Sequence, residues 1–223
     1  MTLLQRLRGE METPRLLLRH WREEDYQDFL AFASDPQVML ASGARPARTQ
    51  EEGERFFRRA LWDSGCYAIV LKETGHPIGK IKFQRDIRRS GVKSLSIGYE
   101  LAKPYWGQGY MTEALRAMVQ YGFERKGLDV LAIGHFKENS RSRRVIEKCG
   151  FHYEGTLSQA FQRFDGKVFD DVCYSILRED YFFLPEAVQK SLRKKEGHIH
   201  MVRINCALHK PLVRNGKERE SNG

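Results

Sequence analysis

The segment from Ser94 to Ala114, SLSIGYELAKPYWGQGYMTEA, constrains the fold more than any other part of the chain. Its first eight residues alternate between apolar and small or polar side chains, which predicts a strand with one buried face. Gly107 and Gly109 follow, and the apolar residues from Met111 onward recur at the helical spacing i, i+3, i+4 and i+7. A strand that passes through a glycine turn into a long helix predicts an α/β chain with a ligand site at the helix N-terminus.

Strands and amphipathic helices alternate along the rest of the chain, and their order predicts one mixed sheet. Asp35-Pro36 ends the first helix, because proline disfavours a helical conformation in the residue before it. Thr49 to Glu52 forms a capping-box pattern that opens the second helix. The expected helices are Glu23–Ala33, Thr49–Trp62, Gly109–Lys126 and Asn139–Lys148. The expected strands are Arg15–His20, Tyr67–Glu73, Ile78–Arg85, Ser94–Leu101, Val130–Phe136, Phe151–Leu157 and Phe169–Leu177.

Length and charge divide the chain into a body and an extension. The 223 residues carry a net charge of +9, and residues 184–223 hold nine Lys or Arg against four Glu. We therefore expect a lead-in at 1–11, one domain at 12–183, and a basic extension at 184–223 that is partly disordered. The body is only mildly basic, which suits a small anionic ligand.

Hydropathy predicts a cytoplasmic chain, and the cysteine pattern predicts free thiols. No stretch approaches the roughly 20 apolar residues of a membrane helix, and the N-terminus has no secretory apolar region. The cysteines, Cys66, Cys149, Cys173 and Cys206, form no C-x-x-C pair, so we expect free thiols and no metal site.

The glycine turn has the properties of an anion cradle. Gly107 and Gly109 let the backbone approach a ligand, the unpaired N–H groups of the first helical turn point towards it, and Thr112 adds a hydroxyl. A Rossmann turn would need a third glycine at position 112, and a P-loop would need Gly-Lys-Ser/Thr. A loop of this composition with nothing bound is the alternative.

The cradle resembles the acetyl-CoA loop of the GNAT superfamily of N-acetyltransferases, which carries Gln/Arg-x-x-Gly-x-Gly/Ala here. Pro104 replaces the Gln or Arg, as is common in the branch of Rim-type ribosomal-protein alanine acetyltransferases. Three further segments are similar to that branch, namely ETPRLLLR at Glu12–Arg19, NSRSRRVIEKCGF at Asn139–Phe151 and FDDVCY at Phe169–Tyr174. The resemblance spans most of the chain. It implies one mixed, largely antiparallel sheet, splayed between its fourth and fifth strands, with helices on both faces.

The resemblance also implies how acetyl-CoA, the co-substrate, is held. The pantetheine arm would lie between Ser94–Leu101 and Val130–Phe136. The pyrophosphate would lie on the N–H groups of Trp106–Met111, Asn139 would bond a pantetheine amide, and Ser142 would sit near the sulfur. The cofactor-binding residues expected are Tyr99, Leu101, Trp106, Gly107, Gln108, Gly109, Tyr110, Met111, Thr112, Asn139 and Ser142.

The implied reaction is direct transfer of the acetyl group to a primary amine, either a protein N-terminus or a small amine. Such a reaction needs a base for the amine proton and an acid for the thiolate, but no metal. Glu100 is the first candidate base, although it could instead have a structural role, and Glu154 could act through a water. Ser142 is the candidate acid, with a solvated helix-start serine as the alternative, and Tyr174 is a second candidate.

The acceptor pocket is expected from two loop regions, 35–48 and 161–168, with Trp106, Phe161 and Phe164 making it partly aromatic. Phe161 matches the place of a catalytic Glu in the Rim-type enzymes, which argues against a ribosomal-protein acceptor. His135 lies near the expected acetyl position, although a structural role is the more ordinary one for a lone histidine.

The arginines at 141, 143 and 144 form either a solvated helix face or a site for the 3′-phosphate of CoA.

Two other functions remain open from the sequence. One is a non-catalytic CoA-binding or regulatory module, and the other is a nucleic-acid binder acting through the basic extension, which we do not favour because the extension lacks interleaved aromatic residues. The oligomeric state, including a homodimer, is also open.

Overall fold

A computed structural model describes residues 9–183, and these form a single eight-stranded sheet. The strands lie in the order β1-β2-β3-β4-β5-β6-β8-β7, and every neighbouring pair is antiparallel except β5 and β6. The mixed, largely antiparallel sheet expected from the sequence is thereby confirmed. The strands are β1 (Met11–Glu12), β2 (Leu16–Arg19), β3 (Cys66–Leu71), β4 (Pro77–Arg85), β5 (Ser94–Leu101), β6 (Val130–Phe136), β7 (His152–Gln162) and β8 (Val168–Leu177).

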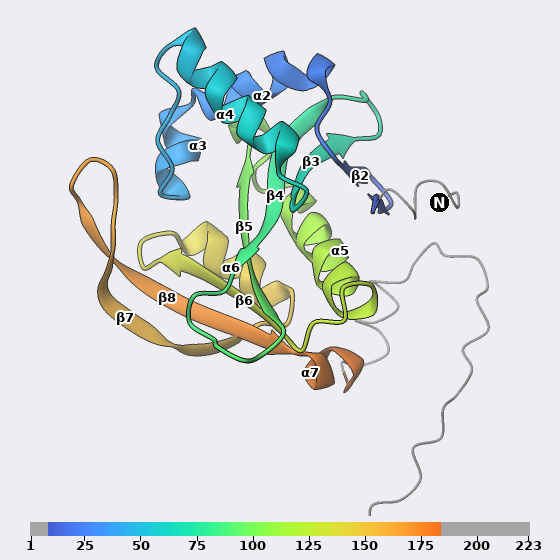
Figure 1. Cartoon of the computed structure of the whole chain (residues 1–223), viewed down its shortest axis with the longest axis vertical. Coiled ribbons are helices and arrows are strands. Elements are labelled where there is room, and N and C mark those ends of the chain that lie inside the picture. The colour runs from blue at the N-terminus through green and yellow to red at the C-terminus, as the bar shows by residue number, and fades with distance from the viewer. Residues whose placement is uncertain (1–8, 184–223) are drawn as a thin grey trace, which may run out of the picture.

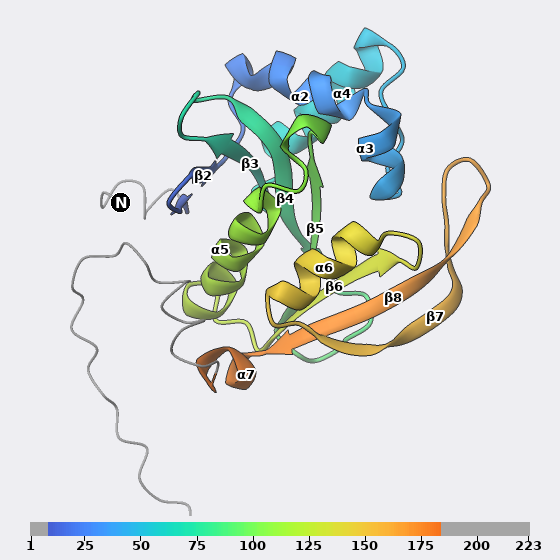
Figure 2. The same cartoon turned by 180° about the vertical axis from the view of Figure 1, so that it is seen from behind.

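Helices cover both faces of the sheet, as the two opposite views show (Figures 1 and 2). The helices α5 and α6 lie on the face turned to the viewer in Figure 2, and α2 and α4 pack at the other side of the β2–β4 region. The helical elements are η1 (Glu23–Asp25), α2 (Tyr26–Ala33), α3 (Pro36–Ala41), α4 (Gln50–Trp62), η2 (Lys103–Tyr105), α5 (Tyr110–Glu124), α6 (Ser140–Lys148) and α7 (Arg178–Phe183).

Strand β3 separates two hydrophobic cores. Its alternate residues Tyr67, Ile69 and Leu71 face the core of α5 and α6, whereas Cys66, Ala68 and Val70 face the core of α2 and α4. The period-two alternation of side chains in a strand explains this division. Both sets are fully buried, so the strand is apolar throughout and holds the two helical layers together.

The sheet opens between β5 and β6, the fourth and fifth of the strands expected from the sequence. The two strands pair from Ser94 opposite Val130 to Ile97 opposite Ile133, and no pairing follows. Residues 98–101 of β5 remain paired with β4, and residues 134–136 of β6 remain paired with β8. Each strand therefore keeps its outer neighbour while its inner edge is left open, which confirms the predicted splay.

The segment after α2 differs from the expectation of a loop. Asp35-Pro36 does end α2, but the same pair begins α3, because Asp35 caps the new helix by accepting a hydrogen bond from Gln37 N at 2.8 Å. Proline fits the first helical position, where its missing N–H would have no partner in any case. The prediction of a loop at 35–48 was therefore wrong over residues 36–41.

Element ends differ from the sequence prediction in smaller ways. Thr49 Oγ1 accepts from Glu52 N at 3.2 Å, but the Glu52 carboxylate accepts from Arg48 N rather than closing the capping box on Thr49. Strand β7 runs on to Gln162, past the expected end at Leu157, because two register shifts let it continue along β8. Met11 pairs with Leu18, so the sheet already begins within the predicted lead-in.

Several expectations fall outside the described residues. Residues 1–8 and the whole basic extension from 184 onward, with Cys206, are among them. Cys66, Cys149 and Cys173 are free thiols. Across residues 9–183, every helix is too short or too polar to span a membrane.

Candidate active site

A cavity of about 800 Å³ lies at the splay and reaches both faces of the sheet. Successive side chains of β5 point to opposite faces of the sheet, so they reach opposite ends of the cavity. Tyr99 and Leu101 lie on the side of α5 and α6, whereas Ser96 and Glu100 lie on the side of α3. A ligand that enters between β5 and β6 could therefore meet groups from both helical layers.

The glycine turn before α5 forms one wall of the cavity. Gly107 and Gly109 have φ values of +77° and +83°, which glycine adopts without strain. A Cβ atom on Gly107 would meet no protein atom within 4 Å, so the turn is open on that side. Within residues 9–183, the backbone N–H groups of residues 107–112 have no protein acceptor. Together these features make a row of free donors at the positive end of a 15-residue helix.

The structure brings most of the predicted cofactor residues to this cavity. Gln108 is the exception, because its side chain turns away and donates to Pro104 O at 2.8 Å. The Leu101 carbonyl accepts from the Trp106 indole at 2.7 Å, which links the end of β5 to the turn. Those that line the cavity are Tyr99, Leu101, Trp106, Gly107, Gly109, Tyr110, Met111, Thr112, Asn139 and Ser142.

Arg15 contacts the outer side of the glycine turn, and the predicted site residues did not include it. Its guanidinium donates to Gln108 O at 3.0 Å and to the Glu113 carboxylate at 2.7 Å, and it lies 4.3 Å from the centroid of the Tyr110 ring. Burial raises the pKa of Glu113, but hydrogen bonds from Thr13 and Arg15 outweigh it, so the net pKa is lowered. The ETPRLLLR segment contains Arg15, but only the fold shows its contact with the turn.

The α6 arginines divide between the cavity and the surface. Arg141 lies over the Trp106 ring, 4.2 Å from its centroid, and both Arg141 and Arg144 line the cavity. Arg143 pairs with Glu147 at 2.8 Å on the exposed face of the helix. The cluster therefore has two cavity-lining members and one surface member.

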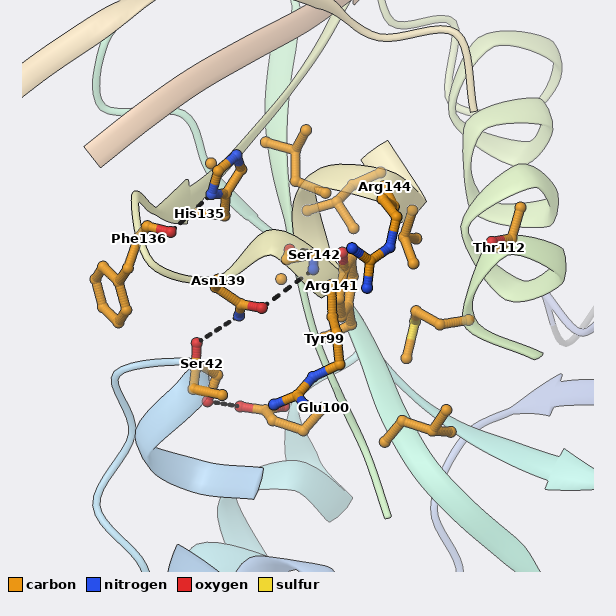
Figure 3. A pocket seen from close by; sticks show the side chains of 18 of the residues that line it. Ser42, Tyr99, Glu100, Thr112, His135, Phe136, Asn139, Arg141, Ser142 and Arg144 are labelled. Atoms are coloured by element: carbon orange, nitrogen blue, oxygen red, sulfur yellow. Dashed lines mark hydrogen bonds between the residues drawn. The ribbon is translucent and has the colours of Figure 1, made fainter. Parts of the chain in front are cut away.

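Asn139 and Ser142 meet at the N-terminus of α6 (Figure 3). Asn139 caps the helix by accepting from Ser142 N at 3.1 Å, and its amide donates to Ala41 O at 3.1 Å, which ties α6 to α3. The Ser142 hydroxyl lies 2.8 Å from the Tyr99 hydroxyl. Burial raises the pKa of Tyr99, so this phenol stays protonated at neutral pH. Sequence reasoning included Tyr99 among the cofactor-binding residues but did not assign a role to its hydroxyl.

Glu100 lies at the α3 end of the cavity and faces Ser42 (Figure 3). Its Oε1 accepts from the Ser42 hydroxyl at 3.0 Å, and its Oε2 lies 3.5 Å from Lys80 Nζ. Within the described part of the chain, Oε2 accepts no hydrogen bond. The Ser42 hydroxyl also faces Met39 O at 3.0 Å, so its single proton is shared between two acceptors.

Glu154 lies outside the cavity. Its carboxylate pairs with Arg89 and accepts from Ser175 Oγ at 2.7 Å. Burial raises the pKa of Glu154, but Arg89 and Ser175 outweigh it, so the net pKa is lowered. A carboxylate that is so well paired and does not line the cavity is a poor base for this site. We therefore retain Glu100 alone as the candidate.

His135 and Tyr174 also differ in position. His135 lines the cavity, its Nδ1 lies 2.8 Å from Phe136 O, and its buried Nε2 has no partner among residues 9–183. Tyr174 does not line the cavity and packs against the rings of His135 and Tyr153. Ser142, with Tyr99 beside it, is therefore the better placed of the two candidate acids.

The two regions expected to form the acceptor pocket meet at the α3 end of the cavity. The Phe161 ring lies 5.1 Å from that of Phe136, and Arg163 donates to Leu40 O at 3.2 Å. Gly43 has φ +79°, and a Cβ there would come within 2.8 Å of Phe136, so only glycine allows this approach. Phe164 does not line the cavity and lies under Arg45 instead.

Comparison with known proteins agrees with this geometry. The profile of the "Acetyltransferase (GNAT) domain" family matches residues 15–152. An uncharacterized N-acetyltransferase of Bacillus licheniformis is 27% identical over 175 residues, which cover 76% of this chain and 96% of that protein. The crystal structure of a GNAT-family acetyltransferase from Bacillus anthracis matches with a TM-score of 0.69 and 26% identity, over 76% of this chain and 99% of that one.

A third comparison concerns the fold alone. The structure of spermidine N-acetyltransferase from Vibrio cholerae in complex with CoA and spermine matches with a TM-score of 0.64 at 19% identity, over 76% of this chain and 99% of that one. The chain thus has the fold of the GNAT acetyltransferases. It belongs to the GNAT family. It is an N-acetyltransferase, as expected.

Proposed function

We propose that this enzyme transfers an acetyl group from acetyl-CoA to a primary amine by direct attack, within the cavity at the splay. The observation that carries the proposal is the row of free N–H groups at residues 107–112, which ends at a cavity reaching Glu100. One end of the cavity suits a diphosphate, and the other suits an amine. An N-acetyltransferase needs both in one connected space.

The residues present fit acetyl-CoA. Free N–H groups at a helix N-terminus favour a pyrophosphate, and the open space beside Gly107 leaves room for it. The inner edges of β5 and β6 are unpaired over residues 98–101 and 134–136 and can hydrogen-bond an extended arm as a strand would. Arg141 and Arg144 add positive charge beside the turn. When bound, acetyl-CoA supplies the activated acetyl group.

Glu100 is the proposed base of this reaction. As the amine nitrogen bonds to the acetyl carbon and the carbon–sulfur bond breaks, the nitrogen loses a proton. Glu100 would accept this proton directly, through a water, or through Ser42, whose hydroxyl already faces its Oε1. The Glu100 side chain is only 9% exposed, so bulk water competes weakly for it.

Ser142 is the proposed acid for the leaving thiolate. Its hydroxyl would donate a proton to sulfur, and the neighbouring Tyr99 hydroxyl would pass its own proton to Ser142 in the same step, so that Ser142 stays neutral and the Tyr99 phenolate is then reprotonated by solvent. The two residues come from β5 and α6, on either side of the cavity, so the pair is held by two elements rather than by a loop.

The acceptor class is a primary amine on a slender, largely apolar stem, either a small molecule or a protein N-terminus. Val38, Ala41, Phe136 and Phe161 line the end of the cavity beside Glu100. These side chains would contact the stem by apolar packing, and Glu100 would meet its amino group. Phe161 offers no carboxylate, unlike the matching position of the Rim-type enzymes.

An acceptor screen tests the proposal. Release of free thiol from acetyl-CoA is measured over a panel of peptides with different N-termini and of small primary amines, with wild-type enzyme and Glu100→Gln. We expect thiol release with at least one acceptor, and a kcat lower by about 10²–10⁴-fold in the variant at unchanged acetyl-CoA affinity. A variant that keeps the wild-type rate and pH profile would exclude Glu100 as the base.

A further inference from the structure

Lys80 lies directly opposite Glu100, on the strand next to it, and its side chain is largely shielded from solvent. The register of β4 and β5 pairs the two residues, and Lys80 Nζ lies 3.5 Å from Glu100 Oε2. The Lys80 side chain is 15% exposed, and that of Glu100 is 9% exposed. A lysine buried to this degree is rare unless its charge is paired.

Among the charges around Lys80, that of Glu100 acts on it most strongly. The ammonium lies 5.7 Å from the Phe29 ring centroid, and the other titratable groups around it are Cys66 and Asp63. Burial is the main cause that raises the pKa of Cys66, to about 11, so this thiol is neutral at pH 7. The Ser42 hydroxyl contacts the other oxygen of Glu100 and carries no charge.

The electrostatics of Lys80 agree with a persistent ion pair. Burial lowers the pKa of Lys80, but the charge of Glu100 outweighs it together with smaller contributions from Cys66, from the direct contact with the Glu100 side chain and from Asp63, and the net pKa is raised. The lysine therefore remains an ammonium throughout the working pH range. Lys80 Nζ lies 3.5 Å from Glu100 Oε2, which is too far for a close hydrogen bond. Oε2 therefore keeps its capacity to accept a hydrogen bond from another donor.

We propose that Lys80 is a positioning residue that keeps the buried carboxylate of Glu100 ionised and ready to accept the proton of the acceptor amine. The inference rests on the proposed role of Glu100 as base. Burial alone would favour the neutral carboxylic acid, which cannot accept a proton. A fixed positive charge on the adjacent strand opposes that tendency, and its distance of 3.5 Å allows the acceptor amine to compete for the same oxygen.

The acid limb of the pH profile of kcat/KM tests this inference, since it reports the ionisation of the free enzyme's essential base. Lys80→Met and Lys80→Gln remove the charge, and Lys80→Arg keeps it. Lys82→Met is the matched control, because Lys82 lies two residues further along β4, opposite Gly98, and makes no ion pair within residues 9–183. All variants are measured with one acceptor, so the titration of the acceptor amine is common to them.

We expect the acid limb to move up by about 1–3 pH units in the uncharged variants, because an opposite charge at this distance favours the charged form by that amount. The limb should stay near the wild-type position in Lys80→Arg and Lys82→Met. A role limited to stability would lower activity evenly at all pH values and leave the limb in place. An unmoved limb in a folded uncharged variant would overturn the inference. So would the failure of both uncharged variants to fold while Lys80→Arg folds.

Glu100→Gln distinguishes a failure of Glu100 as the base from a failure of the role proposed for Lys80. If it abolishes the acid limb while the uncharged Lys80 variants leave the limb unmoved, Glu100 is the base and only the role of Lys80 is refuted. If the limb persists in Glu100→Gln, the proposed base is wrong, and the role of Lys80 falls with it. If Glu100→Gln abolishes the limb and Lys80→Met shifts it, both stand.

Discussion

Replacing Gly107 with alanine tests the cradle with little disturbance of the protein itself. A Cβ on Gly107 would meet no protein atom within 4 Å, so the only cost to the folded protein is the left-handed backbone, φ +77°. That cost is about 1–2 kcal/mol for a residue with a Cβ. Gly75, in the turn between β3 and β4, has φ +76° and is equally open. Gly75→Ala is therefore a control with the same strain and no relation to the cavity.

The expected loss of binding follows from the free N–H groups. If the Cβ of Gly107→Ala keeps the pyrophosphate from at least two of them, at about 1.5 kcal/mol for each hydrogen bond to a charged group, the loss is about 3 kcal/mol. This corresponds to a roughly 100-fold higher Kd for acetyl-CoA. Gly75→Ala should leave the Kd unchanged.

Calorimetric titration with CoA and denaturant unfolding measure the two quantities separately. Both variants should lose about 1–2 kcal/mol of unfolding free energy, and only Gly107→Ala should lose binding. An unchanged Kd in Gly107→Ala would refute the assignment of the pyrophosphate to this turn. Equal losses of binding in both variants would show that strain, and not occupation of the cradle, controls affinity.

Three further changes have distinct expected results. Tyr99→Phe removes the hydroxyl beside Ser142, and steady-state kinetics should show a lower kcat with KM for acetyl-CoA nearly unchanged. Asn139→Ala removes the α6 cap and the bond to Ala41 O, so thermal unfolding should show a loss of about 1–2 kcal/mol. Glu113→Gln should be less stable than wild type above the ordinary pKa of 4.5, because the folded-state pKa of Glu113 is lowered. The difference should vanish as pH falls through that lowered pKa, and urea unfolding at several pH values would show it.

The strand, the turn and the helix of the cradle could be predicted because local rules govern them. Alternation along Ser94–Leu101 requires a strand with two different faces, and Gly107 and Gly109 supply the backbone angles of the turn. Helix α3 escaped prediction because it has six residues, and Asp35-Pro36 is a signal both for ending one helix and for beginning another. Local signals of this kind do not show whether a second helix follows the first one.

Partners far apart in sequence account for most of what was missed at the site. Arg15 reaches Gln108 across 93 residues, and Ser42 reaches Glu100 across 58. The pairing of Lys80 with Glu100 depends on the register of β4 against β5, which periodicity alone does not supply. Sequence reasoning therefore identified Glu100 as a candidate base but could not name Lys80 and Ser42 as the groups that contact its carboxylate.

The splay explains why one site can serve two substrates of opposite character. Opening a sheet exposes backbone groups that must be hydrogen-bonded, which is costly unless a ligand or water pairs with them. Here each strand keeps its outer partner, so the cost is limited to the inner edges at residues 98–101 and 134–136. Those edges face a cavity with free N–H groups and arginines on the α5–α6 side and the Glu100 carboxylate on the α3 side. Since β5 presents Tyr99 to one side and Glu100 to the other, a single residue step along this strand separates the proposed base from the hydroxyl that contacts the proposed acid, Ser142.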